Sequence, residues 1–261
     1  MTPSSASYNT RLQAGLGMLE ETRRLLDLYQ PGMTTSALYD LALTSGQFPL
    51  VSARRLRNIV AECFAPRYIR SGVAIHLKAL AQPLSAAAFQ QLLLVHTALA
   101  NPILADFIRE AYWARYTAGH PTIGKADALA FVREAIRAGK TRTAWSDSTR
   151  DKVAGYLIGA CADFGLLATV RAAQRQIQPP RLQSTTLIFC AYWLHLNNLG
   201  DQGVLNHPLW SLFALQSHEV AEAMKPLARD GWWIIQSAAG AVRITWLHAN
   251  LEEVTHVLAQ G

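Results

Sequence analysis

Three arginines and an asparagine gather at the start of one short segment of the chain, at Arg54, Arg55, Arg57 and Asn58. Guanidinium groups bind phosphate oxygens through charge-assisted, often bidentate hydrogen bonds. Ser52 is a typical N-cap, so these residues would lie in the first turns of a helix, whose N-terminus also favours anions. The chemistry that this pattern predicts is binding of a polyanion, although a solvated helix face carries the same residue types.

A second group of cationic and hydroxyl side chains lies between residues 140 and 175. Its candidates for contacts with phosphates or base edges are Arg142, Ser148, Thr149, Arg150, Lys152, Arg171 and Arg175. Ser148 and Asp151 have the spacing of a capping box, with Asp in place of Glu, which predicts a helix over 148–164. The charged start of this helix has two interpretations: an ordinary solvated helix end, or a surface that binds a polyanion.

Residue types for catalysis or metal binding form no recognisable pattern. The eight histidines are scattered, with no HExxH motif and no paired cysteines beside them. Asp106 and Glu110 lie one helical turn apart and could form an acid pair, but Arg109 lies beside them and a surface ion network is the plainer account. The sequence has no phosphate-binding glycine loop and no nucleophile elbow. We therefore expect no catalytic residues, no metal, no cofactor and no enzyme activity.

Helical periodicity of apolar residues dominates the elements that would position these groups. It predicts helices over 12–26, 35–44, 52–65, 85–117 with a break near Asn101–Pro102, 125–138 and 148–164. The pairs 35–44 with 52–65 and 125–138 with 148–164 have the order of a helix-turn-helix, whose second helix meets DNA with its N-terminal residues. Behind the second pair, residues 166–178 would form extended segments and a wing.

The C-terminal third differs in its pattern. Pro179–Pro180 is the best boundary or linker in the sequence. After several apolar helices, the residues from Trp232 to Trp246 alternate around Gly240, which is typical of a β-hairpin. The helix before this hairpin carries acidic residues and suits a protein partner or internal packing better than DNA.

The predicted fold is therefore mostly α: a helical bundle with winged helix-turn-helix-like subdomains and short β-hairpins. We expect three subdomains, an N-terminal one over 1–80, a central one over 81–180 and a C-terminal one over 181–261. The length of 261 residues is sufficient for more than one core.

Positive charge is unevenly distributed along the chain, whose net charge is +6. Residues 51–80 hold six Lys/Arg against one Asp/Glu, residues 133–181 hold nine against four, and the remainder holds nine against thirteen. The positive charge is thus concentrated in two segments on a mildly acidic remainder, as expected for a footprint on nucleic acid. Many weakly basic proteins have no such partner.

Cysteine and hydropathy patterns indicate a cytoplasmic protein without a membrane span. Cys63, Cys161 and Cys190 are far apart in apolar contexts, which predicts buried reduced thiols and neither disulfides nor a metal cage. The first twenty residues lack the pattern of a signal peptide. The longest apolar run, Leu187 to Leu196, is about half of the roughly 20 residues that a membrane helix needs.

Three stretches resemble the BrxA family of bacteriophage-exclusion (BREX) systems. They are YNTRLQAGLGMLEET (8–22), SARRLRNIV (52–60), and W-x-x-x-T-R-x-K leading to FGLL (145–167) before PPRL. The resemblance implies a mostly helical, non-enzymatic protein with winged helix-turn-helix elements that binds double-stranded DNA. It also implies that the protein acts together with a DNA methyltransferase, an ATPase and a phosphatase-like partner. The candidate contact residues above rest on the residue patterns alone.

The leading hypothesis is a double-stranded DNA-binding accessory protein of a phage-defence system, with largely sequence-independent contacts. The alternative, from the class of protein-interaction subunits, is a scaffold whose basic faces bind acidic partner proteins. A third is an RNA-binding factor of the antitermination kind.

Overall fold

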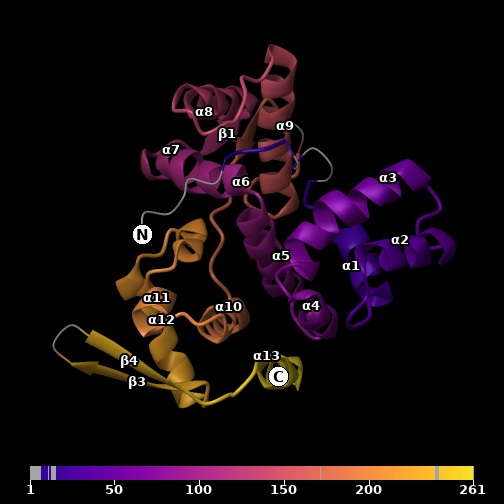
Figure 1. Cartoon of the computed structure of the whole chain (residues 1–261). Helices are drawn as coiled ribbons and strands as arrows, with labels where there is room; N and C mark the ends of the chain where they lie inside the picture. The colour runs from indigo at the N-terminus through magenta and orange to yellow at the C-terminus, as the bar shows by residue number, and fades with distance from the viewer. Residues whose placement is uncertain (1–6, 11, 13–15, 171, 239–240, 261) are drawn as a thin grey trace. The chain divides into compact units, whose positions relative to one another are not determined.

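The computed structural model describes residues 7–10, 12, 16–170, 172–238 and 241–260 (Figure 1). These residues are mostly helical and include two small antiparallel sheets, which confirms the predicted class. The chain forms two compact units, one from Met1–Ile75 and Leu93–Pro180 and the other from His76–Leu92 and Arg181–Gly261. The division into three consecutive subdomains stays a prediction, because contacts alone do not show which segments fold independently.

The first unit is built from helices and two short strands. Its elements are α1 (Leu19–Leu28), α2 (Thr35–Thr44), α3 (Ala53–Asn58), the π-helical η2 (Ile59–Ile69), α6 (Pro102–Asp106), the π-helical η3 (Phe107–Tyr112), α7 (Trp113–Thr117), β1 (Thr122–Gly124), α8 (Lys125–Arg137), α9 (Asp147–Asp163) and β2 (Gln174–Gln176). Helices α4 (Ala74–Leu80) and α5 (Ala86–Ala100) belong partly to each unit.

Helix α1 begins at Leu19, so the prediction of a helix from residue 12 is wrong. Met18 has a left-handed backbone with φ 49°, and the Gly17 N–H donates to Asp163 Oδ2 at 2.9 Å. A Cβ on Gly17 would lie 2.4 Å from the Asp163 Cβ. This contact with a distant helix interrupts the periodicity that the apolar residues continue.

The helix predicted over 52–65 is longer and has two parts, α3 and η2. Ser52 is its N-cap, since its Oγ accepts from the Arg55 N–H at 3.3 Å. Leu56 and Ile59 are buried. Pro66 lies inside η2, where wider i→i+5 turns accommodate a residue without an N–H, so the chain stays helical to Ile69.

Helices α8 and α9 pack against each other (Figure 1), and along the chain extended segments precede α8 and follow α9. Strand β1 pairs antiparallel with β2, placing Ile123 opposite Arg175. Residues 166–168 precede β2 in the chain and pair with the segment from Gln176 to Gln178: the Ala168 N–H donates to Gln176 O at 2.9 Å, and the Gln178 N–H donates to Leu166 O at 2.8 Å. The expected extended segments after Gly165 are therefore present.

Helix α9 begins at Asp147 with Ser146 as its N-cap, so the capping box predicted for Ser148 and Asp151 is wrong. The Ser146 Oγ accepts from the Thr149 N–H at 3.2 Å. Asp151 cannot serve as the reciprocal cap because its carboxylate binds Lys125 Nζ at 2.6 Å. Ser148 and Thr149 consequently lie within the first turn of the helix.

The second unit holds the C-terminal helices and a hairpin. Its elements are α10 (Ser184–Leu196), α11 (Asp201–Leu205), the 3₁₀ helix η4 (Pro208–Phe213), α12 (Ser217–Arg229), β3 (Trp233–Ala238), β4 (Ala241–Trp246) and α13 (Leu251–Gln260). Strands β3 and β4 pair antiparallel, with Trp233 opposite Trp246 and Ile235 opposite Ile244, which confirms the predicted hairpin. Asn250 caps α13, accepting from the Glu253 N–H at 2.9 Å.

Cys63, Cys161 and Cys190 are buried and free, as predicted, and burial raises the pKa of each thiol. Across the residues that the structure describes, no group of three or more His, Cys, Asp or Glu side chains could hold a metal ion. In the same residues, no single helix is long and apolar enough to cross a membrane. The two helical segments Ala86–Ala100 and Pro102–Thr117, which are bent by 114° at their junction, are together long and apolar enough, by length and composition alone.

Candidate nucleic-acid interface

The first basic surface, here called the α3 surface, consists of Arg54, Arg55, Arg57 and Asn58. All four side chains are exposed, whereas Leu56 between them is buried. The short helix therefore presents its polar residues outward because its apolar ones pack inside. The Arg57 guanidinium lies 5.1 Å from the centre of the Tyr39 ring on α2, a cation–π contact that orients this arginine.

The second basic surface, the α9 surface, surrounds the start of α9. Arg142, Ser148 and Lys152 are exposed, whereas Thr149 and Arg150 are half-buried. The Arg150 Nη2 lies 2.5 Å from Asp147 Oδ1, so a neighbouring carboxylate already neutralises this arginine. Among the described residues no ion pair involves Arg142 or Lys152, which leaves these two as the cations best placed to meet an external anion.

The predicted wing contributes less than the sequence indicates. Arg175 lies on β2 and is half-buried, with its Nε shielded from solvent. Burial raises the pKa of Asp163, and the positive charge of Arg175 offsets part of that effect, so Arg175 interacts with an acidic group of its own chain. Arg171, the other wing candidate, lies outside the residues that the structure describes.

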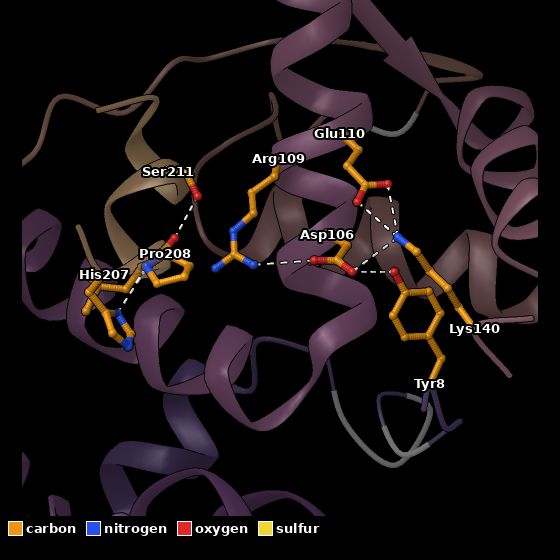
Figure 2. Close-up of polar contacts among 9 residues, drawn as sticks. Tyr8, Asp106, Arg109, Glu110, Lys140, His207, Pro208 and Ser211 are labelled. Atoms are coloured by element: carbon orange, nitrogen blue, oxygen red, sulfur yellow. Dashed lines mark hydrogen bonds and ion pairs between the residues drawn. The ribbon is translucent and has the colours of Figure 1, made fainter. Parts of the chain in front are cut away.

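A network of charged side chains anchors the connection between α8 and α9 (Figure 2). Lys140, in that connection, places its Nζ 3.0 Å from Glu110 Oε1 and 3.5 Å from Asp106 Oδ2. The Tyr8 hydroxyl donates to Asp106 Oδ2 at 2.5 Å, and the Tyr8 N–H donates to Lys140 O at 2.7 Å. Arg109 Nη1 lies 3.3 Å from Asp106 Oδ1.

The ion pairs and hydrogen bonds of this network hold distant segments of the chain together. Asp106 and Glu110 have a lysine and an arginine between and beside them, as the ion-network interpretation predicts. Burial opposes the charge of Lys140, but its contacts with Glu110 and Asp106 together raise its pKa. Because Lys140 precedes Arg142 by two residues, the network holds the backbone from which Arg142 reaches solvent.

The model of the BrxA family matches residues 6–190 of the chain, a range that contains both basic surfaces. The chain belongs to the BrxA family. Membership makes it a protein of BREX phage-defence systems and implies other BREX components as partners. A comparison with curated proteins finds no match.

The fold of this BrxA-family chain is similar to the crystal structure of an uncharacterized protein from Magnetospirillum magneticum. The two share 16% sequence identity with a TM-score of 0.59, over 77% of this chain and 97% of the other. At that identity the likeness concerns the fold alone.

Several residues that shape the two surfaces of this BrxA-family protein were not found by sequence reasoning. The contact of Tyr39 with Arg57 could not be predicted from the sequence, because an aromatic residue on a short helix is usually a core residue. Asp147 next to Arg150 could have been found, since opposite charges three residues apart on a helix interact. The contacts of Tyr8 and Lys140 with Asp106 had no signal in the sequence, because the partners are far apart along the chain.

Proposed function

We propose that this BrxA-family protein binds double-stranded DNA through largely sequence-independent contacts. The observation that carries the proposal is the chain order β1, α8, α9, residues 166–168 and β2, in which β2 pairs with the two other extended segments. That order is expected for a winged helix-turn-helix in which α9 is the recognition helix. The N-terminal residues of such a helix are those that enter the groove.

The side chains at this position suit phosphate more than base edges. Arg142 and Lys152 are exposed cations, and the Ser148 hydroxyl is exposed between them in sequence. Contacts with phosphates position a protein on the duplex but carry no sequence information directly. The α3 surface adds three further exposed guanidinium groups of the same kind. A protein with these contacts would bind many duplex sequences with similar affinity.

In the defence system the protein would act as a non-enzymatic, cytoplasmic subunit beside a DNA methyltransferase, an ATPase and a phosphatase-like protein. The proposal is supported by the scattered distribution of potential catalytic groups and by family membership. Duplex binding would bring the DNA and these partners together.

Mobility-shift titrations with duplex DNA, single-stranded DNA and RNA of equal length, between about 50 and 200 mM salt, test the proposal. We expect preference for the duplex and a steep fall of log K with log salt, about 0.9 per contacted phosphate. Tighter binding of RNA would favour the antitermination-like alternative. Absence of binding to all three, together with binding to acidic partner proteins, would favour the scaffold alternative.

A further inference from the structure

A hollow of about 330 Å³ lies between α2 and the α3–η2 helix, next to the α3 surface. It is lined by Thr35, Ser36, Tyr39, Asp40, Arg57, Val60 and Ala61. All of these residues belong to the first unit. The volume is near the lower end of the range of ligand pockets, about 300–1,000 Å³, and is sufficient for one flat ring system.

The lining combines the groups that hold a nucleobase. Tyr39 is half-buried and supplies an aromatic face, whereas Val60 on the opposite helix is fully buried and offers no surface to a ligand. Unpaired bases are bound by stacking on aromatic side chains, and flipped bases also by hydrogen bonds to their Watson–Crick edge. Asp40 supplies a carboxylate that can accept from the amino or imino N–H that every base carries.

The Arg57 guanidinium covers the Tyr39 ring at 5.1 Å from its centre. At an exposed site a cation–π contact is weak, whereas stacking of a base on an aromatic side chain increases affinity by about 5- to 150-fold. A base could therefore replace the guanidinium on the ring. The released Arg57 would then remain beside the base, within the group of arginines that suits an adjacent phosphate.

We propose that this hollow binds a single unpaired nucleobase together with an adjacent phosphate. Tyr39 stacks on the base, Asp40 accepts a hydrogen bond from its edge, and Arg57 turns to the phosphate. The inference rests on the proposed function, because duplex binding through the basic surfaces would bring an extrahelical base to the hollow. The protein would then recognise DNA that is locally unpaired, in addition to holding paired DNA.

The test compares a fully paired duplex with the same duplex carrying one extrahelical base, using the full-length protein. We expect the wild type to bind the second duplex about tenfold more tightly. Tyr39→Ala should abolish this ratio, whereas Tyr39→Phe should preserve it because the phenyl ring still stacks. Tyr116→Ala is the matched control, since Tyr116 is an exposed tyrosine outside the hollow and its loss should leave the ratio unchanged.

A second measurement distinguishes stacking from a structural effect of the substitution. A duplex with 5-iodouracil as the extrahelical base should crosslink to Tyr39 on irradiation, and mass spectrometry identifies the modified residue. Equal affinity of the wild type for both duplexes, or crosslinking only at other residues, would overturn the inference while duplex binding itself would stand. Failure of the wild type to bind either duplex would refute the proposed function and this inference together.

Discussion

Arg142 and Lys152 offer the sharpest test of duplex binding, because both are exposed at the start of α9 and neither is in an ion pair among the described residues. Replacing both by alanine should remove two phosphate contacts and lower the salt slope by about 1.8, at about 0.9 per contact. Over a fourfold rise in salt, from about 50 to 200 mM, that difference amounts to about 12-fold in relative affinity. The wild type should hold its largest advantage at low salt.

The assay is a fluorescence-anisotropy titration of a labelled duplex at several salt concentrations, beside thermal unfolding of each variant. Exposed surface substitutions change stability by about 0.5 kcal/mol or less, so the double variant should melt as the wild type does. The matched control is the double substitution Arg229→Ala and Arg243→Ala, which removes the same charge from two exposed arginines that are in no ion pair among the described residues. It should leave the salt slope unchanged.

Arg150→Ala provides a finer comparison on the same helix. Asp147 already neutralises Arg150 at 2.5 Å, so this single substitution should lower the slope by less than Arg142→Ala or Lys152→Ala does. The reasoning would be refuted by a folded Arg142→Ala, Lys152→Ala variant that binds duplex with the affinity and the salt slope of the wild type.

The remaining predictions concern the stability of the fold. Leu157→Ala should lower the free energy of unfolding by about 2–5 kcal/mol through a cavity, because Leu157 is fully buried in α9; a loss below about 1 kcal/mol in urea titrations would contradict this packing. Gly155→Ala should raise the free energy of unfolding by about 0.5–1 kcal/mol, because alanine is the better helix former and the nearest heavy atom to an added Cβ is 3.8 Å away. Gly17→Ala should instead be destabilising, since its Cβ would lie 2.4 Å from Asp163 Cβ, and equal effects of the two glycine substitutions would refute the distinction. Burial lowers the pKa of His96 from 6.5 to about 3, so the unfolded chain binds the proton first and stability should fall by about 1.4 kcal/mol per pH unit as the pH drops from 6.5 towards 3. His96→Gln should remove that part of the pH dependence, measured as urea midpoints between pH 7 and 4, and an unchanged slope would show that His96 does not cause it.

Features that depend on neighbours along the chain could be predicted from the sequence. Ser52 caps its helix as predicted, because a cap bonds a backbone N–H three residues ahead. The alternation between Trp233 and Trp246 predicts the hairpin, since side chains on a strand point to opposite faces in turn. Arg54 and Arg57 are exposed because Leu56 takes the buried face of the same helix.

Features that depend on distant partners were decided by the tertiary structure. The positive segment 51–80 includes Arg67, which is only 2% exposed and donates from Nη1 to Leu16 O at 3.0 Å, so it adds nothing to the basic surface. Lys140 is likewise held by Glu110, 30 positions away, and Tyr8 by Asp106, 98 positions away. Counting charges along a sequence cannot separate cations that face solvent from cations that bind their own chain. Only packing decides which groups come within hydrogen-bond distance, and it leaves Arg142 and Lys152 on the α9 surface as the cations directed outward.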